Sequence, residues 1–187
     1  MPVPILPGGR VLLRPWREAD REPFAAMNAD PRVMAYFPQR LDRAESDALF
    51  DRIAGHFAEH GFGPWALELP DLAPFIGFAG LAVPRFHERF TPCVEIAWRL
   101  AFAQWGRGYA TEAARLALAQ GFGPLGLAEV VSFTPRGNQR SRAVMARLGM
   151  THDPAGDFDH PALPRGHRLR RHVLFRLAAA DFRAGGG

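Results

Sequence analysis

The sequence contains no lysine, and all 23 of its basic residues are arginine. This absence excludes a P-loop, because that phosphate-binding motif ends in Gly-Lys-Ser/Thr. An all-arginine set is typical of a GC-rich, bacterial genome rather than of one function. The formal net charge of +4 is modest for this length. It suits an anionic ligand such as a phosphorylated cofactor, and we expect no nucleic-acid partner.

Cysteine and long apolar runs are also scarce. The single cysteine, Cys93, excludes an internal disulfide and fits a reducing compartment, so we expect a cytoplasmic protein. No apolar run approaches the roughly 18 residues of a membrane span, and we expect no membrane partner. The N-terminus, Met-Pro-Val-Pro-Ile-Leu-Pro, lacks the charged region of a signal peptide.

What is present is an ordinary globular composition, with 48% hydrophobic and 22% charged residues. A chain of 187 residues can bury a real core, and no linker divides it, so we expect one domain over 1–187. Its core should span about 10–177. The ends, 1–9 and 178–187, should be irregular.

Hydrophobic spacing alternates along the chain between the period of a strand and that of a helix. Strands are expected at 10–14, 65–69, 75–83, 93–100, 129–134 and 167–177, and helices at 20–27, 32–37, 42–60, 108–122 and 138–148. The segment 150–165 has only a weak pattern. Hairpin neighbours among the strands predict a mixed α/β (α+β) fold, with a mostly antiparallel sheet flanked by helices.

The stretch from Trp98 to Thr111 organises the rest of the chain. A strand ending at Leu100 is followed by a turn with two glycines, Gly106 and Gly108, and then by an alanine-rich helix. Glycines let the backbone approach a ligand closely, and the first amides of a helix attract anions. Arg107 adds a full positive charge. A dinucleotide fingerprint is excluded, because Thr111 stands where its third glycine would be.

These residues carry a resemblance to a known family. Trp105-x-x-Gly108-x-Ala110 is similar to the Gln/Arg-x-x-Gly-x-Gly/Ala motif of the GNAT N-acetyltransferase superfamily. The longer string Trp-Gly-Arg-Gly-Tyr-Ala-Thr-Glu-Ala resembles the RimJ/RimL-type branch, which includes ribosomal-protein-alanine acetyltransferases. Trp105 replaces the usual Gln or Arg. The resemblance covers about 10–177 and implies the GNAT fold and acetyl-CoA as co-substrate. It implies cofactor contacts at Trp98, Leu100, Trp105, Gly106, Arg107, Gly108, Tyr109, Ala110, Thr111 and Asn138.

A second motif begins at Asn138 and ends at Met150. Asn138 is a good helix N-cap, Ser141 lies one turn further on the same face, and Gly149 closes the helix. From these residues alone, a capped core helix is the favoured interpretation. In the family that the motif resembles, the Asn contacts the pantetheine arm and the Ser gives a proton to the departing CoA thiolate. The resemblance therefore makes Ser141 a catalytic candidate.

Glu95 is the candidate general base. It is a lone carboxylate in an apolar strand, and burial would raise its pKa toward the range useful for taking a proton from an amine. The structural alternative is an acid paired with Arg99 or Arg14. A covalent route through Cys93 is a lesser alternative, because nothing in the sequence activates this thiol.

The C-terminal part offers two further groups. Asp and His residues between Thr151 and His172 are too loosely spaced for a metal site, and we expect no metal; they would line the acceptor pocket or form a packing loop. The arginines Arg165, Arg168, Arg170 and Arg171 fit a solvated strand face best, with the CoA 3′-phosphate, an acidic acceptor or RNA as alternatives.

The leading hypothesis is transfer of an acetyl group from acetyl-CoA to a primary amine by direct attack in a ternary complex. The acceptor, a small molecule or a peptide N-terminus, is not readable from the sequence, and a homodimer stays open. The alternatives are a non-catalytic acyl-CoA-binding module and a plain phosphate- or nucleotide-binding domain.

Overall fold

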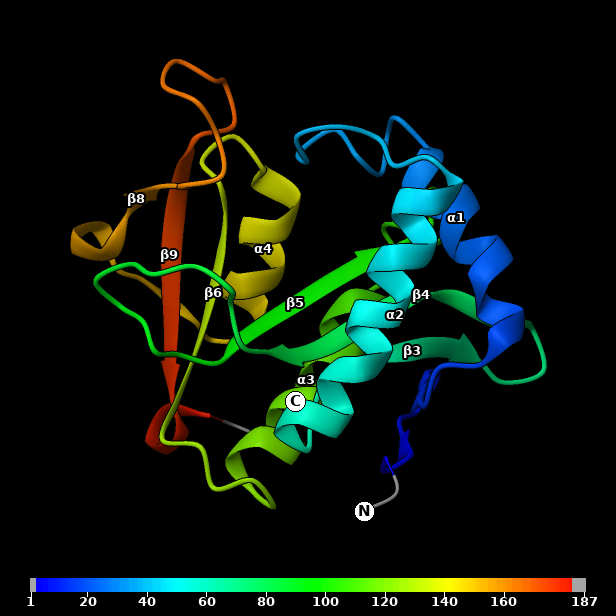
Figure 1. Cartoon of the computed structure of the whole chain (residues 1–187). Helices are drawn as coiled ribbons and strands as arrows, with labels where there is room; N and C mark the ends of the chain where they lie inside the picture. The colour runs from blue at the N-terminus through cyan, green and yellow to red at the C-terminus, as the bar shows by residue number, and fades with distance from the viewer. Residues whose placement is uncertain (1–2, 183–187) are drawn as a thin grey trace.

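The computed structural model of this chain describes residues 3–182, which are built around one mixed sheet (Figure 1). Within this range the strand order is β1-β2-β3-β4-β5-β6-β9-β7, with β8 also paired to β9. All pairs are antiparallel except β5 with β6. The strands are β1 Leu6–Pro7, β2 Leu12–Arg14, β3 Pro64–Leu69, β4 Ala73–Ala82, β5 Glu95–Leu100, β6 Glu129–Pro135, β7 Thr151–His152, β8 Phe158–Asp159 and β9 Arg171–Ala178. The α-helices are α1 Arg21–Ala29, α2 Arg43–His60, α3 Tyr109–Phe122 and α4 Gln139–Arg147. The expected mixed, mostly antiparallel sheet with flanking helices is therefore confirmed.

Two local expectations are wrong. The expected helix at 32–37 is a series of turns, because the Asp30 carboxylate takes the Arg32 main-chain N–H at 2.8 Å and Pro38 disfavours helical backbone at Phe37. The lead-in 1–9 is not irregular throughout, since Leu6–Pro7 forms the edge strand β1, where a proline is tolerated. Residues 1–2 and 183–187 of the two ends lie outside the described range. The last strand is shorter than expected, because 167–170 forms a turn before Arg171.

The helices cover the two faces of the sheet. Helix α3 lies behind the centre of the sheet in Figure 1, and its alanines pack closely on β4 and β5 in the larger core. Helix α4 shares that face and contributes Met145 to the same core. Helices α1 and α2 lie on the opposite face, around Phe24 and Phe50. Residues on alternate positions of β5 therefore look toward different helices.

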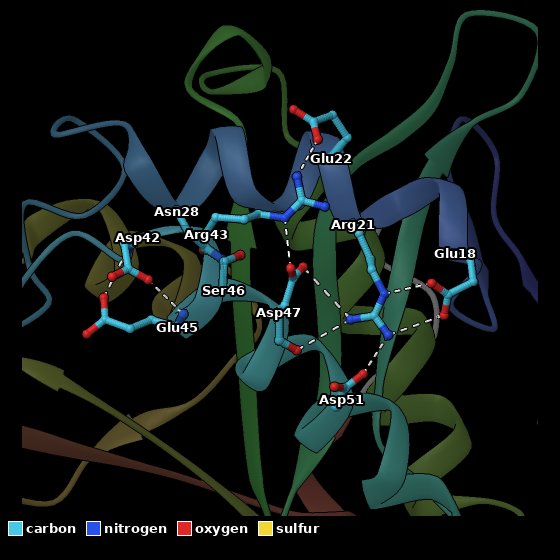
Figure 2. A network of polar contacts seen from close by, with 10 residues as sticks. All are labelled: Glu18, Arg21, Glu22, Asn28, Asp42, Arg43, Glu45, Ser46, Asp47 and Asp51. Carbon is cyan, nitrogen blue, oxygen red and sulfur yellow. Dashed lines mark hydrogen bonds and ion pairs between the residues drawn. The ribbon is translucent and has the colours of Figure 1, made fainter.

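Helices α1 and α2 are fastened to each other by polar contacts. Figure 2 shows Arg21 of α1 between Glu18, Asp47 and Asp51, and Arg43 of α2 between Glu22 and Asp47. Such exposed ion pairs are worth little singly. The buried contact beneath them matters more, because Asn28 and Ser46 are almost without solvent access and Asn28 Nδ2 donates to Ser46 Oγ at 2.9 Å.

The parallel pair β5 and β6 is the feature that positions the site. The two strands are in register at only one position, Glu95 opposite Val131, and then diverge, as Figure 1 shows. The Ser132 hydroxyl donates to the Ile96 carbonyl at 2.9 Å and ends the contact between the strands. Beyond Ile96, no strand of residues 3–182 lies beside the edge of β5.

Candidate active site

A cleft of about 1840 Å³ opens where β5 and β6 separate. All of the site residues expected from the sequence line it, except Arg107. Arg107 is exposed, and its carbonyl, not its side chain, is engaged within the fold. The turn before α3, the gap between the strands and the first turn of α4 thus form one continuous surface.

The turn from Gly106 to Thr111 presents main-chain N–H groups to this cleft. Gly106 and Gly108 have φ angles of 77° and 82°, a left-handed conformation that glycine adopts without strain. Gly108 is the N-cap of α3 and offers no side-chain cap. Among residues 3–182, no acceptor is found for the N–H groups from Gly106 to Thr111. A helix start of this kind is suited to bind a diphosphate.

Arg10 holds this turn in place, and the sequence alone did not indicate it. Its Nη1 donates to the Arg107 carbonyl at 2.9 Å, and its Nε donates to Glu112 at 2.8 Å. Its guanidinium also lies 5.1 Å from the centre of the Tyr109 ring. Arg10 and Glu112 therefore connect the chain before β2 to the first turn of α3. Because they are 102 positions apart, only the folded structure brings them together.

The gap beside β5 exposes one strand edge. The Ile96 carbonyl accepts from Ser132, and the Leu100 carbonyl accepts from the indole N–H of Trp105 at 2.8 Å, so both point away from β4. Peptide groups of alternate residues share an edge, so the Trp98 N–H and C=O also point into the gap. The Trp105 side chain thus binds the main chain of β5. The Leu100 carbonyl already accepts this hydrogen bond.

Asn138 and Ser141 meet on the other side of the gap. Asn138 caps α4, with its Oδ1 accepting from the Ser141 N–H at 3.3 Å. Its Nδ2 donates to Thr134 Oγ1 at 2.9 Å and to Ser141 Oγ at 3.0 Å. Because Ser141 Oγ already accepts a hydrogen bond, its own proton is available for a ligand. The capped-helix interpretation and the functional one are therefore compatible.

Glu95 lies at the closed end of the gap, where β5 still touches β6. Its side chain is partly accessible from the cleft, but surrounding protein desolvates the carboxyl and raises its pKa to about 8. Neither expected arginine pairs with it. Arg14 is buried with Asp20 and Glu68, and Arg99 donates to Asn28. A carboxyl with such a pKa can take a proton near neutral pH.

Cys93 is a poor nucleophile in this setting. Burial, with the nearby Glu95, raises the pKa of its thiol to about 11, so thiolate is scarce near neutral pH. No group of three or more metal-ligating side chains occurs in the part of the chain that the structure describes. No helix of that part is long and apolar enough to cross a membrane.

The loop between β8 and β9 forms part of the cleft wall through His160 and Leu163. Two hydrogen bonds reach across the cleft from the turns after α1, Tyr36 Oη to the Gly137 carbonyl at 3.1 Å and Arg168 Nη2 to the Ala35 carbonyl at 3.0 Å. The other arginines of this segment do not form a free cluster, since Arg170 and Arg171 pair with Asp159.

Three arginines that the sequence did not single out, Arg115, Arg140 and Arg147, line the cleft near the turn. None forms an ion pair with a carboxylate of residues 3–182. Arg140 lies 4.8 Å from the centre of the Trp105 ring. Arg115 lies on α3 and the other two lie on α4, so only the packing of these helices brings the three arginines to one cleft.

Comparison with known proteins agrees with this geometry. The model of the acetyltransferase (GNAT) domain matches residues 10–151. The chain is 34% identical over 156 residues to the FsC-acetyl coenzyme A-N(2)-transacetylase of Aspergillus fumigatus, covering 80% of this chain and 66% of that protein. It is similar to an acetyltransferase structure from Agrobacterium tumefaciens, with a TM-score of 0.75, 28% identity and 95% of each chain covered.

The fold is also that of Mycobacterium smegmatis RimJ, solved in complex with CoA-disulfide, with a TM-score of 0.72, 22% identity, and 95% of this chain and 87% of that chain covered. The chain belongs to the GNAT acetyltransferase family, whose members use acetyl-CoA to acetylate amines.

Proposed function

We propose that the chain acetylates a primary amine by direct attack in a ternary complex, with acetyl-CoA bound along the gap between β5 and β6. The observation that carries this proposal is the row of N–H groups from Gly106 to Thr111, at the mouth of that gap, for which the described part of the chain offers no acceptor. These groups would hold the diphosphate of CoA. Arg115, Arg140 and Arg147 would add positive charge for its phosphates.

The pantetheine arm would lie along the free edge of β5. The Trp98 main chain, which points into the gap, would exchange hydrogen bonds with the amides of the arm, as an added strand does. Asn138 would contact the arm from α4. The Leu100 carbonyl is already bonded to Trp105, so the indole takes over one contact that a ligand would otherwise make.

The chemical step would divide between Glu95 and Ser141. Glu95 would take a proton from the attacking ammonium, directly or through water, and leave a neutral amine. The Trp98 N–H would stabilise negative charge on the thioester oxygen as the amine nitrogen bonds to the carbonyl carbon. Ser141 would donate its proton to the sulfur as the carbon–sulfur bond breaks, and the nitrogen would return a proton to Ser141, directly or through water, as the amide forms. The products are the N-acetylated amine and CoA.

A place in the RimJ/RimL-like branch is supported by the Trp-Gly-Arg-Gly-Tyr-Ala-Thr-Glu-Ala string and by the fold shared with RimJ. Because a fold does not fix the substrate, peptide N-termini and small amines both stay within the proposal. The name of the fungal relative, an N(2)-transacetylase, supports an amine acceptor.

A screen of amines by release of CoA thiol tests the proposal, with Glu95→Gln and Ser141→Ala run beside the unchanged chain. We expect acetylation of at least one amine class and a large loss of turnover in both variants. Binding of acetyl-CoA without acetylation of any amine would instead favour a non-catalytic acyl-CoA-binding module. If CoA does not raise the melting temperature, both the acetyltransferase and the acyl-CoA-binding module are excluded.

A further inference from the structure

Arg99 is a half-buried cation in the cleft for which the acetyl-transfer steps have no use. It lies on β5 four residues after Glu95, and strand geometry places both side chains on the face toward α1 and α2. Both residues line the cleft. Arg99 Nε is buried without a hydrogen-bond partner, and within residues 3–182 no carboxylate forms an ion pair with this arginine.

The guanidinium is held in place by a neutral group. Arg99 Nη1 donates to Asn28 Oδ1 at 2.6 Å. Asn28 gives its own N–H to Ser46 Oγ, so its oxygen is fixed toward Arg99; Figure 2 shows Asn28 and Ser46 facing each other from α1 and α2. An Asp at position 28 would have oriented the arginine and also neutralised it. The Asn orients the arginine and leaves its charge uncompensated.

Aromatic rings complete the setting. The guanidinium carbon lies 4.0 Å from the centre of the Phe37 ring and 5.5 Å from that of Phe78, the partner of Arg99 on β4. Burial, together with the charge of Arg52, lowers the pKa of Arg99 to about 10, so the group stays protonated near neutral pH. A desolvated cation without a counter-ion is unfavourable, and an anion that enters the cleft would relieve this.

We propose that the acceptor is a primary amine that carries a carboxylate remote from the reacting nitrogen, and that Arg99 binds this carboxylate. This inference rests on the proposed acetyl transfer at Glu95. Four residues of strand separate the two Cα atoms by about 13 Å, which favours an acceptor whose charged groups lie at opposite ends. The cleft is also lined by apolar residues, among them Val33, Ile53 and Phe78, so a hydrocarbon body fits there.

A second unpaired atom lies in the same cleft. Gln104 Oε1 is buried and, among the described residues, has no donor. A purely structural role for Arg99, stacking on Phe37 to fix the turn after α1, leaves both its Nε and Gln104 Oε1 unexplained. A carboxylate at Arg99 accounts for the Nε, and Gln104 Oε1, which can only accept, would take a donor group elsewhere on the acceptor, because buried polar groups normally have partners.

The test compares ω-amino acids with n-alkylamines of the same chain length as acceptors, measured by CoA release. We expect the ratio of kcat/KM values to favour the ω-amino acids by at least about tenfold, as for a charged hydrogen-bonded contact. Arg99→Met should bring the ratio close to one, and Arg99→Lys should restore part of it. Arg52→Gln, which removes an exposed neighbouring charge, should leave the ratio unchanged.

A second arm does not require turnover. Unreactive alkyl carboxylates of the same lengths should raise the melting temperature of the unchanged chain and not that of Arg99→Met. Equal use of both acceptor series, or a preference that survives in Arg99→Met, would overturn the proposal for Arg99 alone. If no amine is acetylated although acetyl-CoA binds, the proposed function fails, and the melting-temperature arm still decides whether Arg99 binds a carboxylate.

Discussion

Glu95 links the activity of this chain to its stability, because the desolvation that suits its carboxyl for taking a proton also opposes its ionisation in the fold. Burial raises its pKa well above the ordinary range of a glutamate, to about 8. With that pKa, only about a tenth of the carboxyl is ionised near neutral pH. The value of kcat/KM should therefore rise roughly tenfold between about pH 7 and a plateau above about pH 9.

The stability prediction follows from the sign of the shift. The pKa of Glu95 is higher in the folded than in the unfolded chain, so the stability that comes from the protonated form is complete below the unfolded pKa and is lost as the pH rises through about 8. Between about pH 5.5 and about pH 8.5, the unfolding free energy should fall by at most about 3 kcal/mol relative to Glu95→Gln, which does not titrate.

Two assays check this prediction. CoA release across pH, with two acceptors of different amine pKa, separates the enzyme group from the acceptor, because only the inflection of the acceptor should move. Urea unfolding of the unchanged chain and of Glu95→Gln at the two pH values measures the stability difference. Glu59→Gln, an exposed change on α2, is the control. A Glu95→Gln variant with the original pH–rate profile, or with a pH-independent stability difference, would refute the reasoning.

The other predictions concern the donor side and the core. Ser141→Ala should lower kcat about a hundredfold with little change in the KM for acetyl-CoA, and Ser141→Thr should recover part of the loss. Gly108→Ala should weaken CoA binding, measured by calorimetry, at least about tenfold, because a φ of 82° is strained for alanine and the new Cβ would lie 3.3 Å from Arg10 Nη2. The control is Gly126→Ala, at a glycine with a φ of 64° that lies in open space outside the cleft. It should cost similar stability without weakening CoA binding. Asp20→Asn removes the negative charge of one carboxylate partner of buried Arg14. It should lower the free energy of unfolding, measured in urea, by about 3 kcal/mol.

Local patterns predicted most of the fold, and they indicated the turn and the helix cap that form the proposed donor half of the site. The turn at Gly106 and Gly108 and the cap at Asn138 are signals within a few residues, where backbone preference and hydrogen bonding act directly. The expected helix at 32–37 failed for a local reason too, since Asp30 competes for a main-chain N–H and Pro38 follows. Residue propensities alone do not show that these two features outweigh the helical spacing of the apolar residues.

The acceptor half was not predictable, because its contacts join distant segments. Arg99 and Asn28 are 71 positions apart, and Arg10 and Glu112 are 102 apart. From the sequence, pairing of Glu95 with Arg99, four residues later on the same strand, is an alternative to a catalytic role for Glu95. Only the placement of α1 against β5 shows that Arg99 donates its hydrogen bond to Asn28. Glu95 and Arg99 therefore both line the cleft and do not pair with each other.

Strand β5 divides the proposed reaction between its backbone and its side chains. The peptide groups of Ile96, Trp98 and Leu100 point to the edge where acetyl-CoA would lie, and the first and last of their carbonyls are already bonded. The side chains of Glu95 and Arg99 point to the face covered by α1 and α2. Because backbone contacts tolerate side-chain replacement, acceptor preference can change at such positions without loss of the donor edge. Substitutions at Arg99 should accordingly alter acceptor choice while the KM for acetyl-CoA stays nearly constant.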